Sequence, residues 1–428
     1  MSSFGRPPVS PEGCRRLSKK GAHDMLSPEI LDLLEAIEVS TLDLPLARTM
    51  PGAVYTSEEF YQFELEAIFA REWLCLGHQS QVPNTGDYFT ITIGPEPLVV
   101  VRADDGEINV LSGICQHRGF PITGNAPCGN VKQFRCPYHS WTYSHDGALV
   151  AAPEMSRTCD LEALKAEVAL PALQVEIWNG FIFANMLDDP PPLALSVTKL
   201  DDELRKYGTT DMVAMDPLDY PDQPWNWKGM HENALEPYHT QFVHRGYHEV
   251  APAHNAKFVE WDDGDGQIMH PTYFRHLDGG FNPTLHAMFP IIPGLPEEQR
   301  SRIMFASIPP TAFFALLPDQ VFLFLILPQS AGAMTLRIVW LFPPETLASP
   351  LFKWSYDSQT GANDVLNQQD MTTNRLMQMG QHSRFSPRGH YSHQEATLPQ
   401  FNRWLAQRYR SYVESLEVTS SDAARLST

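Results

Sequence analysis

Two short motifs in the first half of the chain each pair a cysteine with a histidine. Cys115 stands two residues before His117, and Cys136 stands three residues before His139. A [2Fe–2S] cluster with mixed ligands needs two cysteines on one iron and two histidines on the other. A tetrahedral zinc site uses the same residue types, but zinc fingers usually place a cysteine pair before a histidine pair. Because each half of this pattern is mixed, it favours the iron–sulfur cluster, with zinc as the alternative.

A second pair of histidines lies in the stretch NALEPYHTQFVH, which contains Asn233, Glu236, His239 and His244. Two histidines and one carboxylate form a facial triad that holds Fe(II) and leaves positions open for O₂ and substrate. Five residues rotate by ~140° around a straight α-helix, so the two histidines cannot face one metal in an undistorted helix. We therefore expect a π-bulge or a helix break between them, with Gly246 as a candidate terminator.

The third ligand of such a triad must come from another segment, and Asp357, Asp364 and Asp370 are the candidates. A helix predicted over Ala362–Gln381 places Asp370 on its apolar face, whereas Asp364 faces elsewhere and Asp357 precedes the helix. A lone buried carboxylate is costly unless it is paired or binds a metal. Asp370 is therefore the expected third ligand, and His248 is the main rival among the histidines.

The two cysteine–histidine pairs lie in a region in which apolar and polar residues alternate, so that every second residue is apolar. Turns rich in Gly, Asp and Pro separate these runs, which indicates a small antiparallel β domain over residues 73–185. The Pro-rich stretch 188–192 is expected to be a linker. The expected strands are Tyr88–Ile93, Pro97–Arg102, Ile108–Leu111, Phe134–Cys136, Trp141–Tyr143 and Ile177–Ala184.

Residues 186–428 mix helical and strand patterns, which predicts an α+β catalytic domain. An amphipathic helix that starts at Ser57 is expected within residues 46–72 and packs on this domain, while residues 1–45 are expected to be a flexible tail. The expected helices are Leu200–Tyr207, Trp227–Tyr238, Ala362–Gln381 and Leu398–Leu416, and the expected strands are Gln267–Tyr273, Ala312–Leu317, Val321–Leu327 and Thr335–Phe342.

The composition of this 428-residue chain argues against several classes of function. Lys and Arg number 31 against 51 Asp and Glu, which gives a net charge of −20 and argues against nucleic-acid binding and polybasic membrane association. The longest apolar run is far shorter than the ~20 residues of a membrane span. Six cysteines and no secretory signal predict a cytoplasmic protein with reduced thiols.

On these motifs the chain resembles the α subunits of Rieske non-haem iron oxygenases that hydroxylate aromatic rings. The resemblance rests on Cys115–Gly119, on Cys136–Trp141, on the histidine motif and on Gln369–Asp370. It implies a Rieske [2Fe–2S] cluster on Cys115, His117, Cys136 and His139, and a mononuclear Fe(II) on His239, His244 and Asp370. It also implies a helix-grip (START-like) catalytic domain and a head-to-tail homotrimer.

The resemblance further implies a terminal oxygenase that uses O₂ to hydroxylate a small molecule, with Asn233 and Glu236 among its site residues. In such trimers the carboxylate at the position of Glu236 links an iron-binding histidine to a Rieske histidine of the neighbouring subunit. The chain has neither a dinucleotide-binding fingerprint nor a plant-type ferredoxin motif. It therefore needs a reductase, with or without a separate ferredoxin, and Arg118, Lys132 and Arg135 are candidates for the docking surface.

The substrate remains open between two classes. Most ring-hydroxylating members have Asp where this chain has Glu236, and Glu there resembles the carnitine and glycine-betaine monooxygenases. The apolar segments Phe274–Pro290 and Ile308–Leu327 favour an aromatic or other cyclic substrate. A Rieske electron-transfer protein without oxygenase activity is a third alternative, but such a protein has no use for His239, His244 and a second domain.

Overall fold

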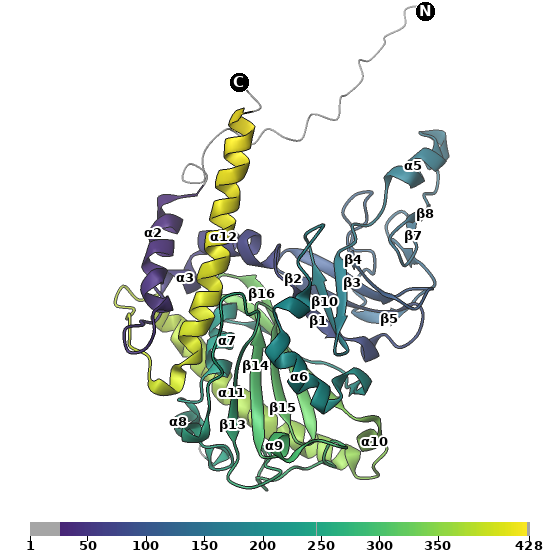
Figure 1. The fold of residues 1–428 in the computed structure, drawn as a ribbon. Coiled ribbons are helices and arrows are strands. Elements are labelled where there is room, and N and C mark those ends of the chain that lie inside the picture. Colours follow the sequence, from purple (N-terminus) through teal and green to yellow (C-terminus); the bar gives the residue numbers. More distant parts are fainter. Residues whose placement is uncertain (1–25, 245, 426–428) are drawn as a thin grey trace, which may run out of the picture.

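The computed structural model describes residues 26–244 and 246–425, so residues 1–25 of the expected tail lie outside it. Figure 1 shows a smaller β-rich part beside a larger part in which a twisted antiparallel sheet is flanked by long helices. This arrangement is the α+β class expected from the sequence. No helix of the described residues is long and apolar enough to cross a membrane.

Three short antiparallel sheets build the smaller part, in the strand orders β4-β3-β2-β5, β1-β10-β9 and β6-β7-β8. Alternating apolar residues supply its core, because successive side chains of a strand face opposite sides. The strands are β1 (Leu74–His78), β2 (Asp87–Ile93), β3 (Glu96–Arg102), β4 (Ile108–Ser112), β5 (Cys128–Asn130), β6 (Phe134–Arg135), β7 (Thr142–Tyr143), β8 (Leu149–Ala151), β9 (Gln174–Trp178) and β10 (Phe181–Asn185).

The single strand expected over Ile177–Ala184 is wrong, because this segment forms the β9–β10 hairpin. Its turn consists of Asn179 and Gly180, both with a positive φ (50° and 87°), which is the conformation that tight two-residue hairpins require. A Cβ atom at Gly180 would lie 2.3 Å from Nε2 of His78. The turn therefore needs glycine for its conformation and for space.

A seven-stranded sheet dominates the larger part, in the order β11-β17-β16-β15-β14-β13, with β12 also paired to β17. Helix α11 (Phe352–Gln381) runs along one face of this sheet, and α12 (Thr397–Arg425) packs against its β13 edge. The strands are β11 (Val213–Ala214), β12 (Leu218–Gln223), β13 (Ile268–Tyr273), β14 (Arg302–Ile308), β15 (Ala312–Leu317), β16 (Gln320–Ser330) and β17 (Ala333–Phe342). The shorter helices are α6 (Thr198–Tyr207), α7 (Trp227–Leu235), α8 (Thr240–Val243), α9 (Glu297–Arg300) and α10 (Pro344–Leu347).

The expected flexible tail over residues 1–45 is wrong from residue 28 onward, because helix α2 spans Pro28–Ile37. Ser27 caps it by accepting a hydrogen bond from the backbone N–H of Ile30 at 3.3 Å. Its apolar residues recur with helical spacing and are buried, and α2 contacts α12. The proline- and serine-rich composition further upstream concealed this short amphipathic helix.

A buried ion pair joins the helix that begins after Ser57 to the catalytic part. Ser57 caps α4 (Glu58–Glu64), as expected, and the chain continues through a π-helical turn at Leu65–Phe69. Both oxygens of Glu64 lie within 2.8 Å of Nζ of Lys228 on α7, and neither side chain is exposed. The carboxylate also accepts hydrogen bonds from Trp227 (3.1 Å) and Tyr409 (2.5 Å). Burial lowers the pKa of Lys228, and the charge of Glu64 opposes that shift.

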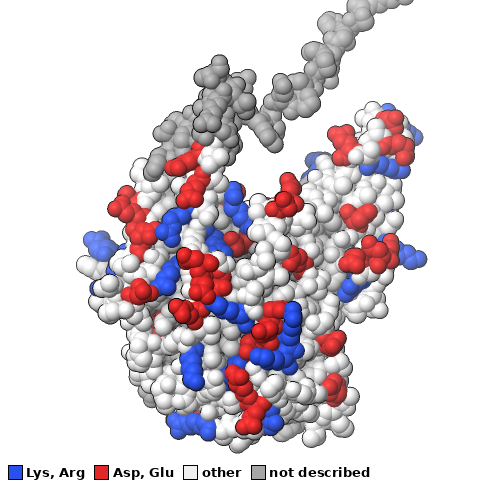
Figure 2. All heavy atoms as spheres, viewed as in Figure 1, with Lys and Arg blue, Asp and Glu red and all other residues white. Residues whose placement is uncertain are grey.

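Charges of both signs are spread over the surface. On the face that Figure 2 shows, acidic and basic side chains are interspersed, and no broad area is uniformly basic. A nucleic-acid-binding face would concentrate Lys and Arg. The face in this view has no such concentration.

We expect Glu64→Ala to lower the free energy of unfolding by about 3–5 kcal/mol, because it leaves a charged lysine buried without a partner. Urea unfolding followed by tryptophan fluorescence measures the loss. Asp357→Ala is the control, since it breaks the exposed pair with Lys353 and should cost less than about 1 kcal/mol. Equal losses in the two variants would contradict a structural role for the buried pair.

Candidate functional site

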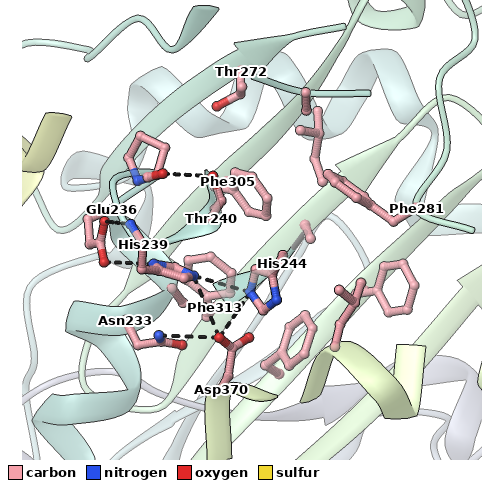
Figure 3. Close-up of a pocket in the computed structure, with 18 of the residues that line it drawn as sticks. Asn233, Glu236, His239, Thr240, His244, Thr272, Phe281, Phe305, Phe313 and Asp370 are labelled. Carbon is pink, nitrogen blue, oxygen red and sulfur yellow. Dashed lines mark hydrogen bonds and ion pairs between the residues drawn. The ribbon is translucent and has the colours of Figure 1, made fainter. Parts of the chain in front are cut away.

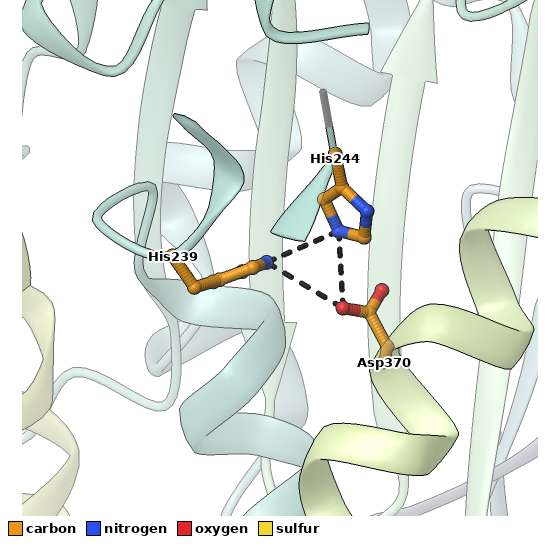
Figure 4. A group of neighbouring side chains, drawn as sticks. All are labelled: His239, His244 and Asp370. Carbon is orange, nitrogen blue, oxygen red and sulfur yellow. Dashed lines mark hydrogen bonds and ion pairs between the residues drawn. The ribbon is translucent and has the colours of Figure 1, made fainter. Parts of the chain in front are cut away.

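Three side chains that can bind a metal converge in the larger part of the chain (Figure 4). The Nε2 atoms of His239 and His244 lie 3.2 Å apart. Oδ1 of Asp370 lies 3.0 Å from Nε2 of His244 and 3.6 Å from Nε2 of His239. Two ligands at ~2.1 Å from a metal are ~3 Å apart when the angle between them is 90°. The three atoms therefore have the separations of ligands on one face of a metal ion.

The two histidines stand at the two ends of a short helix, α8. Helix α7 ends at Leu235, and Glu236 is extended, with φ −122° and ψ 133°. His239 precedes the four-residue helix α8, and His244 follows its last residue with φ −101° and ψ 54°. The expected π-bulge or break between the histidines is therefore not found: the helical turn between them is continuous, and the backbone leaves the helix at His244 itself.

Each histidine is oriented through its other ring nitrogen. Nδ1 of His239 lies 2.6 Å from Oε1 of Glu236, whose Oε2 also accepts the backbone N–H of His239 at 3.0 Å. Nδ1 of His244 lies 2.8 Å from Oε1 of Gln369 on α11. Burial lowers the pKa of His239, but the hydrogen bond and charge of Glu236, with the charge of Asp370, outweigh burial and raise it. Asn233 donates a longer hydrogen bond to Oδ1 of Asp370, at 3.4 Å.

The protonation pattern of this arrangement calls for a cation. A carboxylate and an amide oxygen only accept hydrogen bonds, so both Nδ1 atoms carry a proton, and in the neutral imidazoles both Nε2 atoms present a lone pair. These lone pairs and the Asp370 carboxylate converge on one point. Three acceptors at this separation repel one another unless a proton or a metal ion lies between them. The donor set of two imidazoles and one carboxylate is the set that suits Fe(II).

A cavity of about 160 Å³ opens beside these three side chains (Figure 3). Its wall is the inner face of the sheet, where alternate residues of β13, β14, β15 and β16 point toward α11. Helix α11 closes the other side with Asn363, Leu366, Asn367 and Asp370. The residues of the sheet that line the cavity are His270, Thr272, Ile303, Phe305, Phe313, Ala315, Leu317, Phe322 and Phe324.

The rival candidates for metal ligands are not part of the converging group. His248 lines the same cavity and contacts Thr240 (3.3 Å), but it is not part of the converging group. Asp357 pairs with Lys353, and Asp364 accepts a hydrogen bond from Tyr220 at 3.0 Å. Of the three candidate aspartates, the structure brings only Asp370 to the histidines.

The two cysteine–histidine loops of the smaller part have the same construction. The backbone N–H of Cys115 donates to Phe120, and that of Cys136 donates to Trp141. In each loop the fourth residue after the cysteine has a positive φ, 74° at Gly119 and 61° at Ser140. Both turns carry a half-buried histidine beside a buried cysteine.

The side chains of these loops meet at one point. The rings of His117 and His139 lie 4.6 Å apart, and His117 also stacks on Trp141 at 4.7 Å. The hydroxyl of Tyr143 lies 3.3 Å from Sγ of Cys115, and burial is the main cause that raises the pKa of this thiol. Nδ1 of His117 is buried without a hydrogen-bond partner. Two thiols and an unsatisfied imidazole nitrogen at one point are the donors that a mixed-ligand [2Fe–2S] cluster uses.

Sequence reasoning missed two parts of these sites. The Gln369–His244 hydrogen bond was not foreseen, although Gln369 stands next to the expected ligand Asp370. The contact of Tyr143 with the first loop was also missed, because it links residues that are 28 positions apart. The remaining described cysteines, Cys75, Cys128 and Cys159, are free, and Cys14 lies outside the described residues.

Two family models match the chain in the regions that contain these sites. Residues 72–172 match the Rieske [2Fe-2S] domain, and residues 210–411 match the catalytic domain of the ring hydroxylating alpha subunit. Together the two matches cover more than half of the chain. The first contains all four side chains of the cysteine–histidine loops, and the second contains the converging triad.

Individual relatives belong to two groups. The glycine betaine monooxygenase oxygenase subunit of Chromohalobacter salexigens is 32% identical over 256 residues, which are 58% of this chain and 55% of the relative. The benzene 1,2-dioxygenase subunit alpha of Pseudomonas putida is 41% identical over 148 residues, which are 35% of this chain and 32% of the relative. The chain thus spans about half the length of the betaine relative and a third of the benzene relative.

Solved structures show the same fold at lower identity. The quaternary ammonium Rieske monooxygenase CntA, in complex with an inhibitor, has a TM-score of 0.73 at 21% identity and covers 88% of this chain and 98% of its own. Naphthalene 1,2-dioxygenase from Rhodococcus sp., bound to indole, also has a TM-score of 0.73, at 20% identity, with coverage of 90% and 98%. These likenesses confirm the predicted fold. The two family models, which together match more than half of the chain, show that it belongs to the Rieske non-haem iron oxygenase α subunits, whose cofactors are a [2Fe–2S] cluster and a mononuclear iron.

Proposed function

We propose that this chain is the terminal oxygenase component of a multicomponent Rieske system that hydroxylates an aromatic or other cyclic small molecule. O₂ is the oxidant, and NAD(P)H supplies electrons through a reductase. The observation that carries this proposal is the group formed by His239, His244 and Asp370 at the wall of an apolar cavity. A protein that only transfers electrons has no need of this cavity.

In this proposal His239, His244 and Asp370 hold Fe(II), while Cys115, His117, Cys136 and His139 hold the [2Fe–2S] cluster. The iron supplies O₂ activation at a position that adjoins the substrate cavity. The protein side chains keep the ligands in the required state. Glu236 and Gln369 hold the protons on the Nδ1 atoms, and Asn233 orients the carboxylate of Asp370. The apolar sheet face excludes water from the reacting ring.

The lining of the cavity supports a ring-shaped substrate without charge. Five phenylalanines line the cavity, and none of the described lining residues is a lysine or an arginine. Glycine betaine and carnitine each carry a carboxylate, which would lose its hydration there without gaining a cationic partner. A cavity of ~150 Å³ lined by Leu, Ile and Phe is large enough for benzene. The five are Phe281, Phe305, Phe313, Phe322 and Phe324.

The electron donor is proposed to dock beside the cluster loops. Arg118, Lys132 and Arg135 are all exposed there, and the guanidinium of Arg118 lies over the ring of Tyr138, 5.5 Å from its centroid. Tyr138 is itself 52% exposed. An exposed basic and aromatic surface is suited to an acidic partner such as a ferredoxin or a reductase domain. We place this exchange in the cytoplasm, which the five free described cysteines support.

A homotrimer is proposed because the two metal sites of one chain are far apart. Strand β7 follows the second cluster loop, and it lies on the opposite side of the molecule from α8, which follows His239 (Figure 1). A neighbouring subunit can place its cluster loops nearer to the iron. Glu236 already binds His239, and we propose that it also reaches His139 of the adjacent subunit. The carboxylate would then connect the two metal sites.

We expect His244→Ala and Asp370→Ala to lose bound Fe(II) and turnover while the visible spectrum of the cluster is unchanged, because the two sites share no ligand. Iron analysis together with absorption spectra measures both centres. Cys115→Ser is the reciprocal control, and it should remove the red-brown colour. Full iron content in Asp370→Ala would show that another carboxylate is the ligand.

We expect uncharged ring compounds to stimulate NAD(P)H and O₂ consumption in the presence of a reductase and to yield hydroxylated products. Glycine betaine and carnitine should not, because their carboxylate has no cationic partner among the described residues of the cavity. Product analysis by mass spectrometry over a panel of both classes is the measurement. Coupled release of formaldehyde from betaines, with no product from rings, would overturn the substrate class.

We expect Glu236→Gln to retain both metal centres but to slow electron transfer from cluster to iron by tenfold or more, because the amide no longer provides the charged link to a neighbouring His139. Single-turnover stopped-flow absorption at the cluster band measures this rate. The exposed Glu249→Gln serves as a matched control. A normal rate in Glu236→Gln would rule out the link.

A further inference from the structure

The two histidines of the triad are supported by groups of different charge. A carboxylate, Glu236, lies 2.6 Å from Nδ1 of His239, whereas a neutral amide, Gln369, lies 2.8 Å from Nδ1 of His244. Gln369 and Asp370 are consecutive residues of α11. Asp370 therefore provides the carboxylate of the triad, and Gln369, the residue before it on α11, holds His244.

The orientation of the Gln369 amide decides which nitrogen of His244 is available. With the oxygen toward Nδ1, that nitrogen carries the proton and Nε2 presents its lone pair beside Asp370, 3.0 Å away. With the amide reversed, its NH₂ group would donate to Nδ1, and Nε2 would carry the proton toward the position of the metal. Only the first arrangement gives three acceptors for a cation. A carboxylate such as Glu236 has no such alternative.

Because its amide is uncharged, Gln369 adds no negative charge to the iron site. Two carboxylates, Asp370 and Glu236, already contact the histidines, and the carboxyl of Glu395, whose pKa is raised mainly by burial, also interacts with Glu236 and His239. A glutamate at position 369 would orient His244 in the same way but would add a further negative charge beside half-buried groups, whose side chains are 10–21% exposed. An additional negative charge stabilises Fe(III) relative to Fe(II). The neutral amide of Gln369 therefore orients His244 without favouring Fe(III) over Fe(II).

We propose that Gln369 is a positioning residue of the iron site: it fixes the metal-binding tautomer of His244 and adds no negative charge to the site. This inference rests on the proposed function, since it assumes that the triad binds iron. It assigns no contact with the substrate to Gln369. Its effect reaches the reaction only through His244 and the iron.

The test compares Gln369→Met, which removes the hydrogen bond at similar size, with Gln368→Met on the exposed side of the same helix. Fe(II) alone is the probe, and its affinity is measured by competition with a chromogenic chelator. Loss of a group that orients a metal-binding histidine typically weakens metal binding 10–100-fold. We expect that loss in Gln369→Met, an unchanged affinity in Gln368→Met, and an unchanged cluster spectrum in both.

Gln369→Glu separates orientation from charge. It should retain Fe(II) affinity within a few-fold of the unsubstituted protein and should lower the Fe(III)/Fe(II) midpoint potential, measured by redox titration. Unchanged Fe(II) affinity in Gln369→Met, or an equal loss in Gln368→Met, would overturn the role of Gln369. An unchanged potential in Gln369→Glu would overturn the charge argument. Failure of the unsubstituted protein to bind Fe(II) would instead overturn the proposed function, and no arm of the test depends on the substrate.

Discussion

The convergence of three hydrogen-bond acceptors on one point is the constraint on which the rest of the catalytic part depends. His239, His244 and Asp370 present two lone pairs and a carboxylate within 3.0–3.6 Å of one another. With neutral imidazoles this arrangement is repulsive unless a cation binds, and several features of the chain maintain it. The backbone leaves the helix at His244, Glu236 and Gln369 hold the imidazole protons away, and α11 carries the carboxylate into the fold.

The surrounding helices and sheet hold these three side chains beside an apolar cavity. The triad residues lie at the two ends of α8 and on α11, so the relative positions of α7, α8 and α11 must be fixed. The sheet supplies a wall on which α11 rests, and the buried pair of Glu64 and Lys228 ties α7 to the N-terminal helix. Because Lys228 lies on the same helix as Asn233, packing at that pair reaches the site through one rigid element.

The parts of the site that are local in sequence could be predicted. The four cluster side chains and the two iron histidines lie in short motifs, and Asp370 was found because helical periodicity placed it on an apolar face. The cavity wall could not be predicted in detail, since it requires the register of four strands and the side of the sheet on which α11 lies. The support of His244 by Gln369 was also missed, because it joins residues 125 positions apart. Within the fold, α2 and the β9–β10 hairpin were misread because short elements leave few periods to detect.

The measurement that tests the central claim most directly is anomalous diffraction at the iron absorption edge, on crystals grown with Fe(II). The account predicts an anomalous peak at bonding distance from Nε2 of His239, Nε2 of His244 and a carboxylate oxygen of Asp370, separate from the peak of the cluster. A structure in which the triad holds no iron, or in which His248 replaces one of the three ligands, would contradict it.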